Sequence, residues 1–184
     1  MKLNRVWSSL KNMKIKSPKE FKIHQISAKM ACEYNSYWHS RLPKIHWSNV
    51  VRNTHYVCYG AFIGLNCYAV GIWSSPVAQN RFKDGKQILE LRRYAIKEEA
   101  PKFTASWMLG KMEKEIAAKF SDIKRLISYQ DTEVHKGTIY KASNWVATNT
   151  TKNISWTTQN RKRNKEQATG DKIRWEKLIN NQRR

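Results

Sequence analysis

The stretch SYQDTEVHKGTIYKASNW, residues 128–145, changes its pattern in the middle. The run RLISYQD (125–131) resembles the end of a buried strand, and TIYKASNW (138–145) resembles a short helix. Side chains that can act in catalysis or ligand binding are close to this change: Ser128, Tyr129, Asp131, His135 and Tyr140. Ligands of open α/β sheets bind at the ends of buried strands, so this junction is predicted to be a site. The alternative is an unusually polar turn.

The segments on either side of this junction alternate between strand and helix patterns. Apolar spacing predicts helices at 27–42 and 104–120, with Ser27 as a cap of the first and Thr104 or Ser106 as a cap of the second. Strands are predicted at 56–63, 67–74, 87–97 and 123–130, followed by a short helix at 137–145 and a last strand at 145–151. This order predicts an α/β (α+β) fold, with a mixed central sheet flanked by helices.

Charge is the strongest global signal in the chain. It carries 35 Lys and Arg against 14 Asp and Glu, a formal net charge of +21. The excess is concentrated at both ends, which suggests a basic segment at 1–24, a catalytic domain at 25–157 and a basic tail at 158–184, helical or disordered until a partner binds. Solubility and a membrane surface are the alternatives, but nucleic acid is favoured, with Arg161, Lys162 and Arg163 contacting phosphates.

Cysteine and histidine give weaker indications. Cys32, Cys58 and Cys67 lack the spacing of a zinc site, and the histidines form no metal-binding motif, so reduced thiols and no metal site are expected. No apolar run approaches the roughly 18 residues of a membrane span. The basic N-terminal stretch lacks the apolar core of a secretory signal. These features predict a cytoplasmic protein with no membrane partner.

The start of the predicted 104–120 helix is a candidate anion site. Lys102, Thr104, Ala105 and Ser106 would offer a cation, hydroxyls and backbone N–H groups to a phosphate. Thr and Ser are also ordinary helix caps, so this signal has two interpretations. Neither a GxGxxG motif nor a Walker loop is present, which argues against dinucleotide and nucleoside-triphosphate folds. Arg93, on the preceding strand, could hold a carboxylate, carboxamide or phosphate.

The junction at 128–145 offers candidate catalytic groups. Asp131 could act as a base, Tyr140 could protonate a leaving group, and Ser128 could donate a hydrogen bond. Each of these residues has a structural alternative, because Tyr rings fill cores and Asp side chains cap turns. Their clustering at one strand end favours the catalytic interpretation.

The order of elements around YKASNW (140–145) resembles the GNAT acyltransferase fold. In that family a hairpin precedes a splayed central strand, a loop and helix start bind the pyrophosphate of acyl-CoA, and a tyrosine on a later helix is the general acid. The resemblance places Tyr140 at that tyrosine. The usual glycine-rich phosphate loop is replaced here by APKFTASW (100–107). The resemblance implies acetyl-CoA or another acyl- or glycyl-type compound as the donor.

A narrower resemblance is to the Mom group of phage DNA-modification proteins. It rests on YWHSRLP (37–43), ELRRYAI (90–96), TASWMLGK (104–111) and ISYQDTEVHKGTIYKASNW (127–145). The last block is the most specific. It matches that group's pattern at Ser128, Tyr129, Asp131, Gly137, Tyr140, Ala142 and Trp145. The chain departs from the pattern by losing one glycine before His135 and by placing His39 one position late.

The Mom resemblance implies carbamoylmethylation of the N6 amine of adenine in double-stranded DNA, which protects phage DNA from host restriction. Contacts to DNA are then expected from His39, Arg41, Tyr129, His135 and Lys136, together with the basic tail. Two other functions stay open. One is a GNAT acetyltransferase acting on an amine of a protein, a tRNA or a small molecule. The other is a nucleic-acid binder without enzymatic activity.

Overall fold

The computed structural model describes residues 15–38, 42–152 and 170–179 of the chain. Within them lies one seven-stranded sheet with the order β1-β2-β3-β4-β5-β7-β6. The strands are β1 (Lys22–Gln25), β2 (Tyr56–Ile63), β3 (Asn66–Ser74), β4 (Ile88–Ile96), β5 (Arg125–Asp131), β6 (Val146–Thr151) and β7 (Lys172–Leu178). Neighbouring strands are antiparallel except β4 and β5, which are parallel. The predicted mixed sheet is confirmed.

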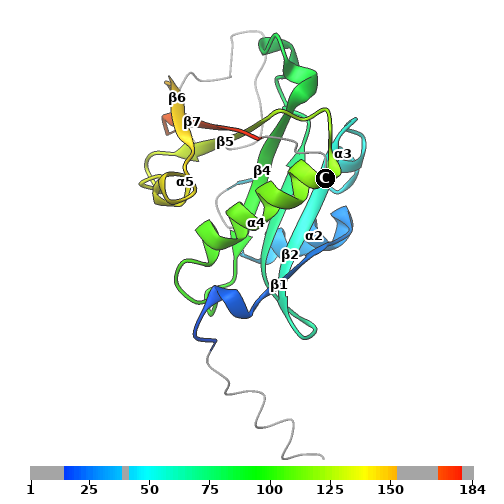
Figure 1. The fold of residues 1–184 in the computed structure, drawn as a ribbon, viewed down its shortest axis with the longest axis vertical. Coiled ribbons are helices and arrows are strands. Elements are labelled where there is room, and N and C mark those ends of the chain that lie inside the picture. The colour runs from blue at the N-terminus through cyan, green and yellow to red at the C-terminus, as the bar shows by residue number, and fades with distance from the viewer. Residues whose placement is uncertain (1–14, 39–41, 153–169, 180–184) are drawn as a thin grey trace, which may run out of the picture.

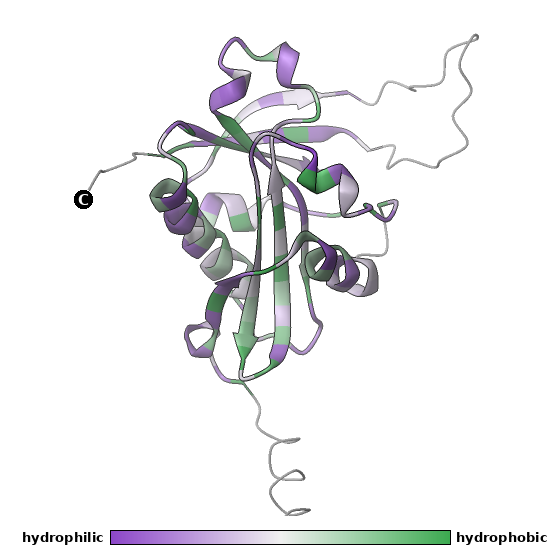
Figure 2. Cartoon of the chain, turned by 90° about the vertical axis from the view of Figure 1, so that its right-hand side faces the viewer, coloured by the Kyte–Doolittle hydropathy of each residue, from purple (hydrophilic) through white to green (hydrophobic). Residues whose placement is uncertain are grey.

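Helices cover both faces of the sheet, as Figures 1 and 2 show. Helix α4 (Thr104–Lys119) and the short α5 (Thr138–Ala142) pack on one face, which we call the α4 face. Helix α2 (Ala28–Trp38) and the short α3 (Ser48–Val51) pack on the other, which we call the α2 face. None of the helices in the described residues is long and apolar enough to cross a membrane.

The main core lies between the sheet and α4. Met108, Leu109, Met112 and Ile116 form the buried stripe of α4, and Trp73 is the largest fully buried side chain beneath them. Gly71 is required at this contact, because a Cβ there would lie 2.4 Å from the Met112 sulfur. The sheet is therefore pressed against α4 directly beside the central strand β4.

Strands β4 and β5 pair over only part of their length. The parallel register runs from Ile88 opposite Arg125 to Leu91 opposite Ser128 and stops there. Beyond Leu91 a register shift marks a bulge at Arg92, and β4 continues alongside β3 while β5 continues alongside β7. Figure 1 shows β5 and β7 turning away from β4 at this point. The resulting splay lies at the carboxyl ends of β4 and β5, which is where open α/β sheets bind ligands.

The C-terminal segment departs from its prediction. A helical or disordered tail was expected after residue 157, but Lys172–Leu178 form β7, which is inserted between β5 and β6. Ile173, Trp175 and Lys177 face α4, and Arg174 and Glu176 face the other side. The alternation of apolar and charged residues in this segment is too short to predict a strand within a basic stretch of sequence. Only the pairing with β5 and β6 makes it a strand.

The helix caps were predicted correctly for α2 and wrongly for α4. The Ser27 hydroxyl accepts a hydrogen bond from the Met30 N–H at 3.2 Å, as expected of a cap. In α4 the cap position is Phe103, at φ 68°, and no side chain caps the helix. The Thr104 and Ser106 hydroxyls instead donate to the carbonyls of Pro101 and Phe103. Helix α4 therefore begins without the side-chain acceptor that its first N–H groups usually receive.

Candidate functional site at the splay of the sheet

Tyr140 and Ser128 form the centre of the site. Ser128 is the last residue of β5 that pairs with β4, and Tyr140 lies on α5, which follows β5 after a short loop. Their hydroxyls share a hydrogen bond of 2.8 Å. Both side chains are buried, and burial raises the pKa of the Tyr140 phenol although the bond to Ser128 opposes that shift. Tyr140 therefore keeps its proton at neutral pH, as a general acid must.

Two tryptophans hold the Tyr140 ring. Trp175 of β7 stacks on it with ring centroids 5.3 Å apart and planes 15° from parallel. Trp145 meets it at 5.6 Å in a tilted arrangement. The Trp175 indole N–H donates to Gln130 Oε1 at 2.7 Å, and the Gln130 amide donates in turn to the His135 carbonyl. The loop between β5 and α5 is thus fastened to the strand that carries Ser128.

A buried ion pair supports this aromatic group from α4. Glu113 accepts a hydrogen bond from the Trp145 indole N–H at 2.6 Å and pairs with the Lys177 ammonium at 2.8 Å. The Glu113 side chain is only 9% exposed. One carboxylate therefore links α4, the start of β6 and β7, and fixes Trp145 beside Tyr140.

Tyr94 connects the site to the beginning of α4. Its hydroxyl donates to the Ala105 carbonyl at 2.7 Å, and its ring lies on the α4 face of β4 beyond the bulge. Burial, and secondarily the nearby Tyr140, raise the pKa of the Tyr94 phenol. The Ser143 hydroxyl also reaches the Ser106 carbonyl at 3.4 Å. These contacts place the uncapped start of α4 beside the Tyr140 and Ser128 pair.

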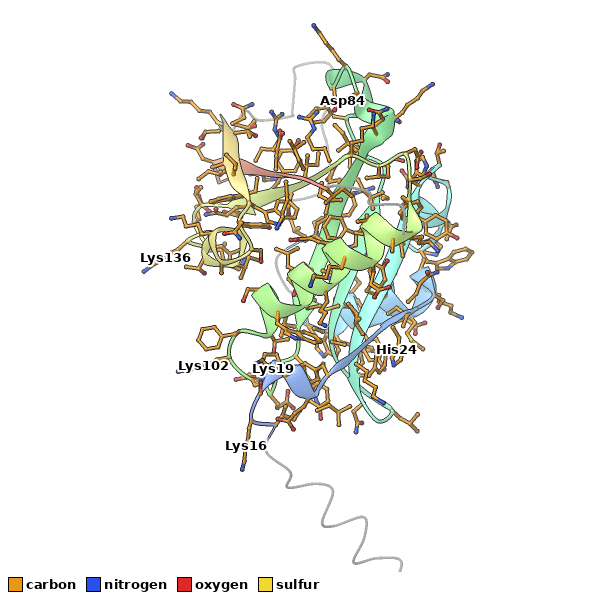
Figure 3. All side chains as sticks on the ribbon, in the orientation of Figure 1. Lys16, Lys19, His24, Asp84, Lys102 and Lys136 are labelled. Atoms are coloured by element: carbon orange, nitrogen blue, oxygen red, sulfur yellow. The ribbon has the colours of Figure 1, made fainter. Side chains whose placement is uncertain are left out.

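The predicted anion-binding residues at α4 fall into two groups. Thr104 is buried, and Ala105 and Ser106 are half-buried, whereas Lys102 is exposed just before the helix. Figure 3 shows Lys102 and Lys136 projecting from the same side of the molecule. The backbone at the helix start and these exposed ammonium groups suit an anionic, phosphate-bearing ligand.

Asp131 does not join Tyr140 and Ser128. Side chains alternate along β5, so Ser128 and Gln130 face α4 while Tyr129 and Asp131 face the opposite side. Asp131 is half-buried at the end of the strand. Its carboxylate accepts a hydrogen bond from the Glu133 N–H at 3.1 Å and closes the turn there. The exposed His135 lies in the same loop, and its N–H donates to the Asp131 carbonyl at 3.0 Å.

Arg93 also lies on the α2 face, away from the start of α4 where a donor phosphate was expected. The bulge at Arg92 sets this direction, since Arg93 is paired with Ile72, a residue of the cluster under α2. The Arg93 guanidinium donates to the carbonyls of Arg92 at 2.7 Å and Pro43 at 3.3 Å. Burial, and secondarily Arg92, lower its pKa.

A second polar cluster on the α2 face consists of Glu90 and residues that contact it. Glu90 is buried, accepts a hydrogen bond from the Val77 N–H at 3.0 Å and lies 3.9 Å from Arg92 Nε. Arg92 also donates to the Ser74 hydroxyl at 3.1 Å. Burial raises the Glu90 pKa, although the Val77 N–H and nearby cations oppose the shift. These contacts anchor the loop after β3, so Glu90 serves the fold of that loop.

Five predicted nucleic-acid contacts, His39, Arg41, Arg161, Lys162 and Arg163, lie outside the described residues. In the part of the chain that the structure describes, no group of three or more His, Cys, Asp or Glu side chains is arranged to hold a metal ion.

Sequence reasoning missed several residues of the site. Tyr94 was counted only within a strand, because the bulge that keeps it on the α4 face has no clear sequence signal. Trp175 and Lys177 were assigned to a tail, and Glu113 of α4 was not singled out. The alternation of Ile173 and Trp175 with charged residues was the one signal that could have identified β7.

Comparison with known protein families gives one match over most of the chain. The model of the Mom protein family matches residues 20–184. This range includes the site and β7, and it begins just before β1. No curated protein sequence matches the chain.

Solved structures resemble the chain in fold at low sequence identity. A ribosomal-protein alanine N-acetyltransferase from Escherichia coli superposes with a TM-score of 0.61 at 10% identity, covering 86% of this chain and 94% of that one. A Bacillus subtilis acetyltransferase in complex with CoA gives 0.55 at 15% identity, covering 86% and 99%. A GNAT acetyltransferase from Elizabethkingia anophelis with acetyl-CoA bound gives 0.56 at 15% identity, covering 87% and 99%. The predicted GNAT-like fold is confirmed.

Proposed function

Because the chain belongs to the Mom protein family, we propose that it is a phage-type transferase that modifies the N6 amine of adenine in double-stranded DNA, by carbamoylmethylation, and so protects that DNA from restriction. The observation that carries the proposal is the buried Tyr140 and Ser128 pair at the splay, next to an uncapped helix start. A neutral phenol and an anion-binding helix start are what a transfer from a phosphate-bearing donor requires.

The donor belongs on the α4 face in this proposal. Fold neighbours bind CoA or acetyl-CoA, and α4 here begins without a side-chain cap, just after the exposed Lys102. The donor is acetyl-CoA or another acyl- or glycyl-type compound. A thioester carbonyl alone would yield an N6-acyl product, whereas a carbamoylmethyl group is joined through a CH2 carbon. The reacting atom of the donor is therefore a CH2 carbon, and it lies at the splay.

The acceptor belongs on the α2 face, where Asp131 lies. The N6 amine of adenine is a poor nucleophile, because its lone pair is delocalised into the ring. As nitrogen forms its bond to the donor carbon, the bond from that carbon to the leaving group breaks, and the leaving group keeps the electron pair. Asp131 takes the proton that the amine gives up, and Tyr140 protonates the leaving group. The target base first leaves the stack, at a cost of a few kcal/mol.

The net charge of +21 supports the choice of DNA as partner. An N-acetyltransferase acting on a protein, tRNA or small-molecule amine is the second candidate, favoured by the acetyltransferases among the fold neighbours. A nucleic-acid binder without activity is the third, and it would not need the buried acid that Tyr140 provides.

Restriction protection tests the proposal. The chain is expressed with a plasmid that carries sites for endonucleases whose cleavage depends on adenine N6. Under the proposal, wild type protects these sites and Tyr140→Phe does not, while enzymes reading G·C-only sites cut both plasmids. Complete cleavage of both plasmids by both classes of enzyme would contradict DNA modification. Turnover of acetyl-CoA on a non-DNA amine would then favour the second candidate.

A further inference from the structure

Three buried side-chain donors of the described residues lack partners: Arg125 Nε in β5 and, on two elements that face each other, Asn35 Nδ2 and Arg93 Nε. Asn35 of α2 is 4% exposed, yet its Nδ2 atom has no hydrogen-bond acceptor in the described structure. The Nε atom of Arg93 in β4 also has no acceptor, whereas both terminal nitrogens of this guanidinium donate hydrogen bonds. Unpaired donors in a protein interior are rare, because burial removes their bonds to water without replacement. A native fold that keeps two of them here calls for an acceptor.

Asn35 and Arg93 face the same space between α2 and the sheet. The buried residues of α2 are Ala28, Ala31, Cys32 and Asn35, which follow one stripe at helical spacing. Cys32 of that stripe packs against Ile72, the cross-strand partner of Arg93, and Arg93 is close enough to lower the pKa of the Cys32 thiol against the larger effect of burial. Asn35 is the next residue of the stripe toward the end of α2. It is also the only amide in that stripe.

The surroundings suit a flat, electron-rich ligand. Tyr34 and Trp38, on the same helix as Asn35, stack at 4.9 Å with planes 22° apart, and both pack against Val70 and Ala95 on this face. Tyr37 on α2 is 79% exposed, and the exposed Lys44 follows the helix. Within the described residues no ion pair joins Arg93 to a carboxylate, although the buried Glu90 is close enough to oppose the lowering of the Arg93 pKa. The Arg93 Nε–H itself has no acceptor there.

We propose that Asn35 and Arg93 form the pocket for the acceptor base, in which the Asn35 carboxamide and the Arg93 Nε–H bind a flipped-out adenine. An amide pairs with adenine by donating to a ring nitrogen, N1 or N7, while accepting from the exocyclic amine. The Arg93 N–H supplies a second donor to an acceptor of the same ring. Asn35 is thus a positioning residue that aims the amine at the splay beyond the Arg92 bulge. This inference rests on the proposed function.

Binding of modified duplexes tests the pocket without any donor. The probes are three fluorescent duplexes in which one adenine, 1-deazaadenine or 7-deazaadenine faces an abasic site, so that the base is free to leave the stack. Wild type is expected to bind the adenine duplex at least fivefold more tightly than one of the two deaza duplexes. Asn35→Leu is expected to bind all three alike, and Ser36→Ala, a neighbouring change on α2, is expected to keep the wild-type preference.

Folding controls keep the test decisive. Asn35→Leu removes an unpaired amide with a side chain of similar size, so its melting temperature should equal or exceed that of wild type. Arg93→Met is a second variant that removes the other free donor and should also reduce the preference. Equal wild-type affinity for all three duplexes, or an unchanged preference in folded Asn35→Leu, would overturn the pocket. Absence of binding to every duplex, together with unmodified plasmid DNA, would instead overturn the proposed function.

Discussion

Tyr140 and Asp131 lie on opposite faces of β5. The Tyr140 hydroxyl meets Ser128 on the α4 face at 2.8 Å, and Asp131, three residues further along the strand, faces the other side. The two groups would therefore serve different reactants. In the proposed reaction, Tyr140 is the acid on the side of the donor, and Asp131 is the base on the side of the acceptor. The group would then be transferred at the splay, between the two faces of the sheet.

Replacing Asp131 by Asn should abolish modification while preserving the fold and DNA binding. The amide oxygen can still accept the Glu133 N–H but cannot take a proton, so the rate should fall by about 10²–10⁴. Modified deoxyadenosine per plasmid is the measurement, and Asp122→Asn, before the start of β5, is the control. Modification at more than a tenth of the wild-type level would rule out Asp131 as the base.

Replacing Tyr140 by Phe should separate chemistry from stability. The ring keeps its stack on Trp175, so only the hydrogen bond to Ser128 is lost, at about 1 kcal/mol. Urea unfolding measures that loss, and the rate should fall much more than the stability. Ser128→Ala removes the partner but leaves the phenol, so it should keep more activity than Tyr140→Phe. The reverse order of activities would assign the acid role to Ser128.

Alkaline pH should destabilise the protein through its buried phenols. The pKa values of Tyr94 and Tyr140 are raised by burial, whereas the unfolded chain ionises Tyr near its ordinary value of about 10. Above pH 10 the unfolded state therefore loses protons that the folded state retains, so stability present below pH 10 falls as pH rises. Urea unfolding between pH 9 and 11 measures the slope. Tyr140→Phe should make it shallower, and an identical slope would contradict the assignment.

The Glu113 and Lys177 pair should be essential for docking β7. Lys177→Met leaves the buried Glu113 carboxylate without its cation, which should cost about 3–5 kcal/mol. The double variant Glu113→Gln, Lys177→Met should recover much of this loss, because Gln can still accept the Trp145 N–H. Thermal unfolding of the single and double variants provides the comparison. Equal destabilisation in both would show that the pair is not coupled.

The basic segment before β7 should set the salt dependence of DNA binding. Deleting residues 158–184 is unsuitable as a test, since it removes β7 and with it Trp175 and Lys177. Changing Arg161, Lys162 and Arg163 to Gln leaves the strand intact. The slope of log affinity against log salt should become shallower by about 0.9 for each phosphate that the variant no longer neutralises. An unchanged slope would show that these residues do not bind DNA phosphates.

Local patterns predicted most of the fold. The strands at 56–63 and 67–74, the α4 stripe and the strand before Asp131 follow from apolar spacing and turn residues, and they agree with the structure within a few residues. β7 could not be predicted in this way. Its seven residues become a strand only by pairing on both sides with β5 and β6, and such pairing is a tertiary effect.

The candidate site was predicted in composition but not in geometry. The sequence pointed to Ser128, Asp131 and Tyr140 by their closeness to one strand end. It could not assign them to faces, because a shift of one residue in a strand exchanges the two faces. The direction of Arg93 depends on the bulge at Arg92 in the same way. The unpaired Asn35 amide is visible only once α2 is packed on the sheet.

Mass spectrometry of nucleosides detects the transferred group itself. Plasmid DNA from cells expressing wild type, Tyr140→Phe or Asp122→Asn is digested to nucleosides and compared. Under the proposed function, wild type and Asp122→Asn yield a new deoxyadenosine species, heavier by a carbamoylmethyl group, and Tyr140→Phe yields none. Only unmodified deoxyadenosine from folded, DNA-binding wild type, or the same new species at full level from Tyr140→Phe, would contradict it.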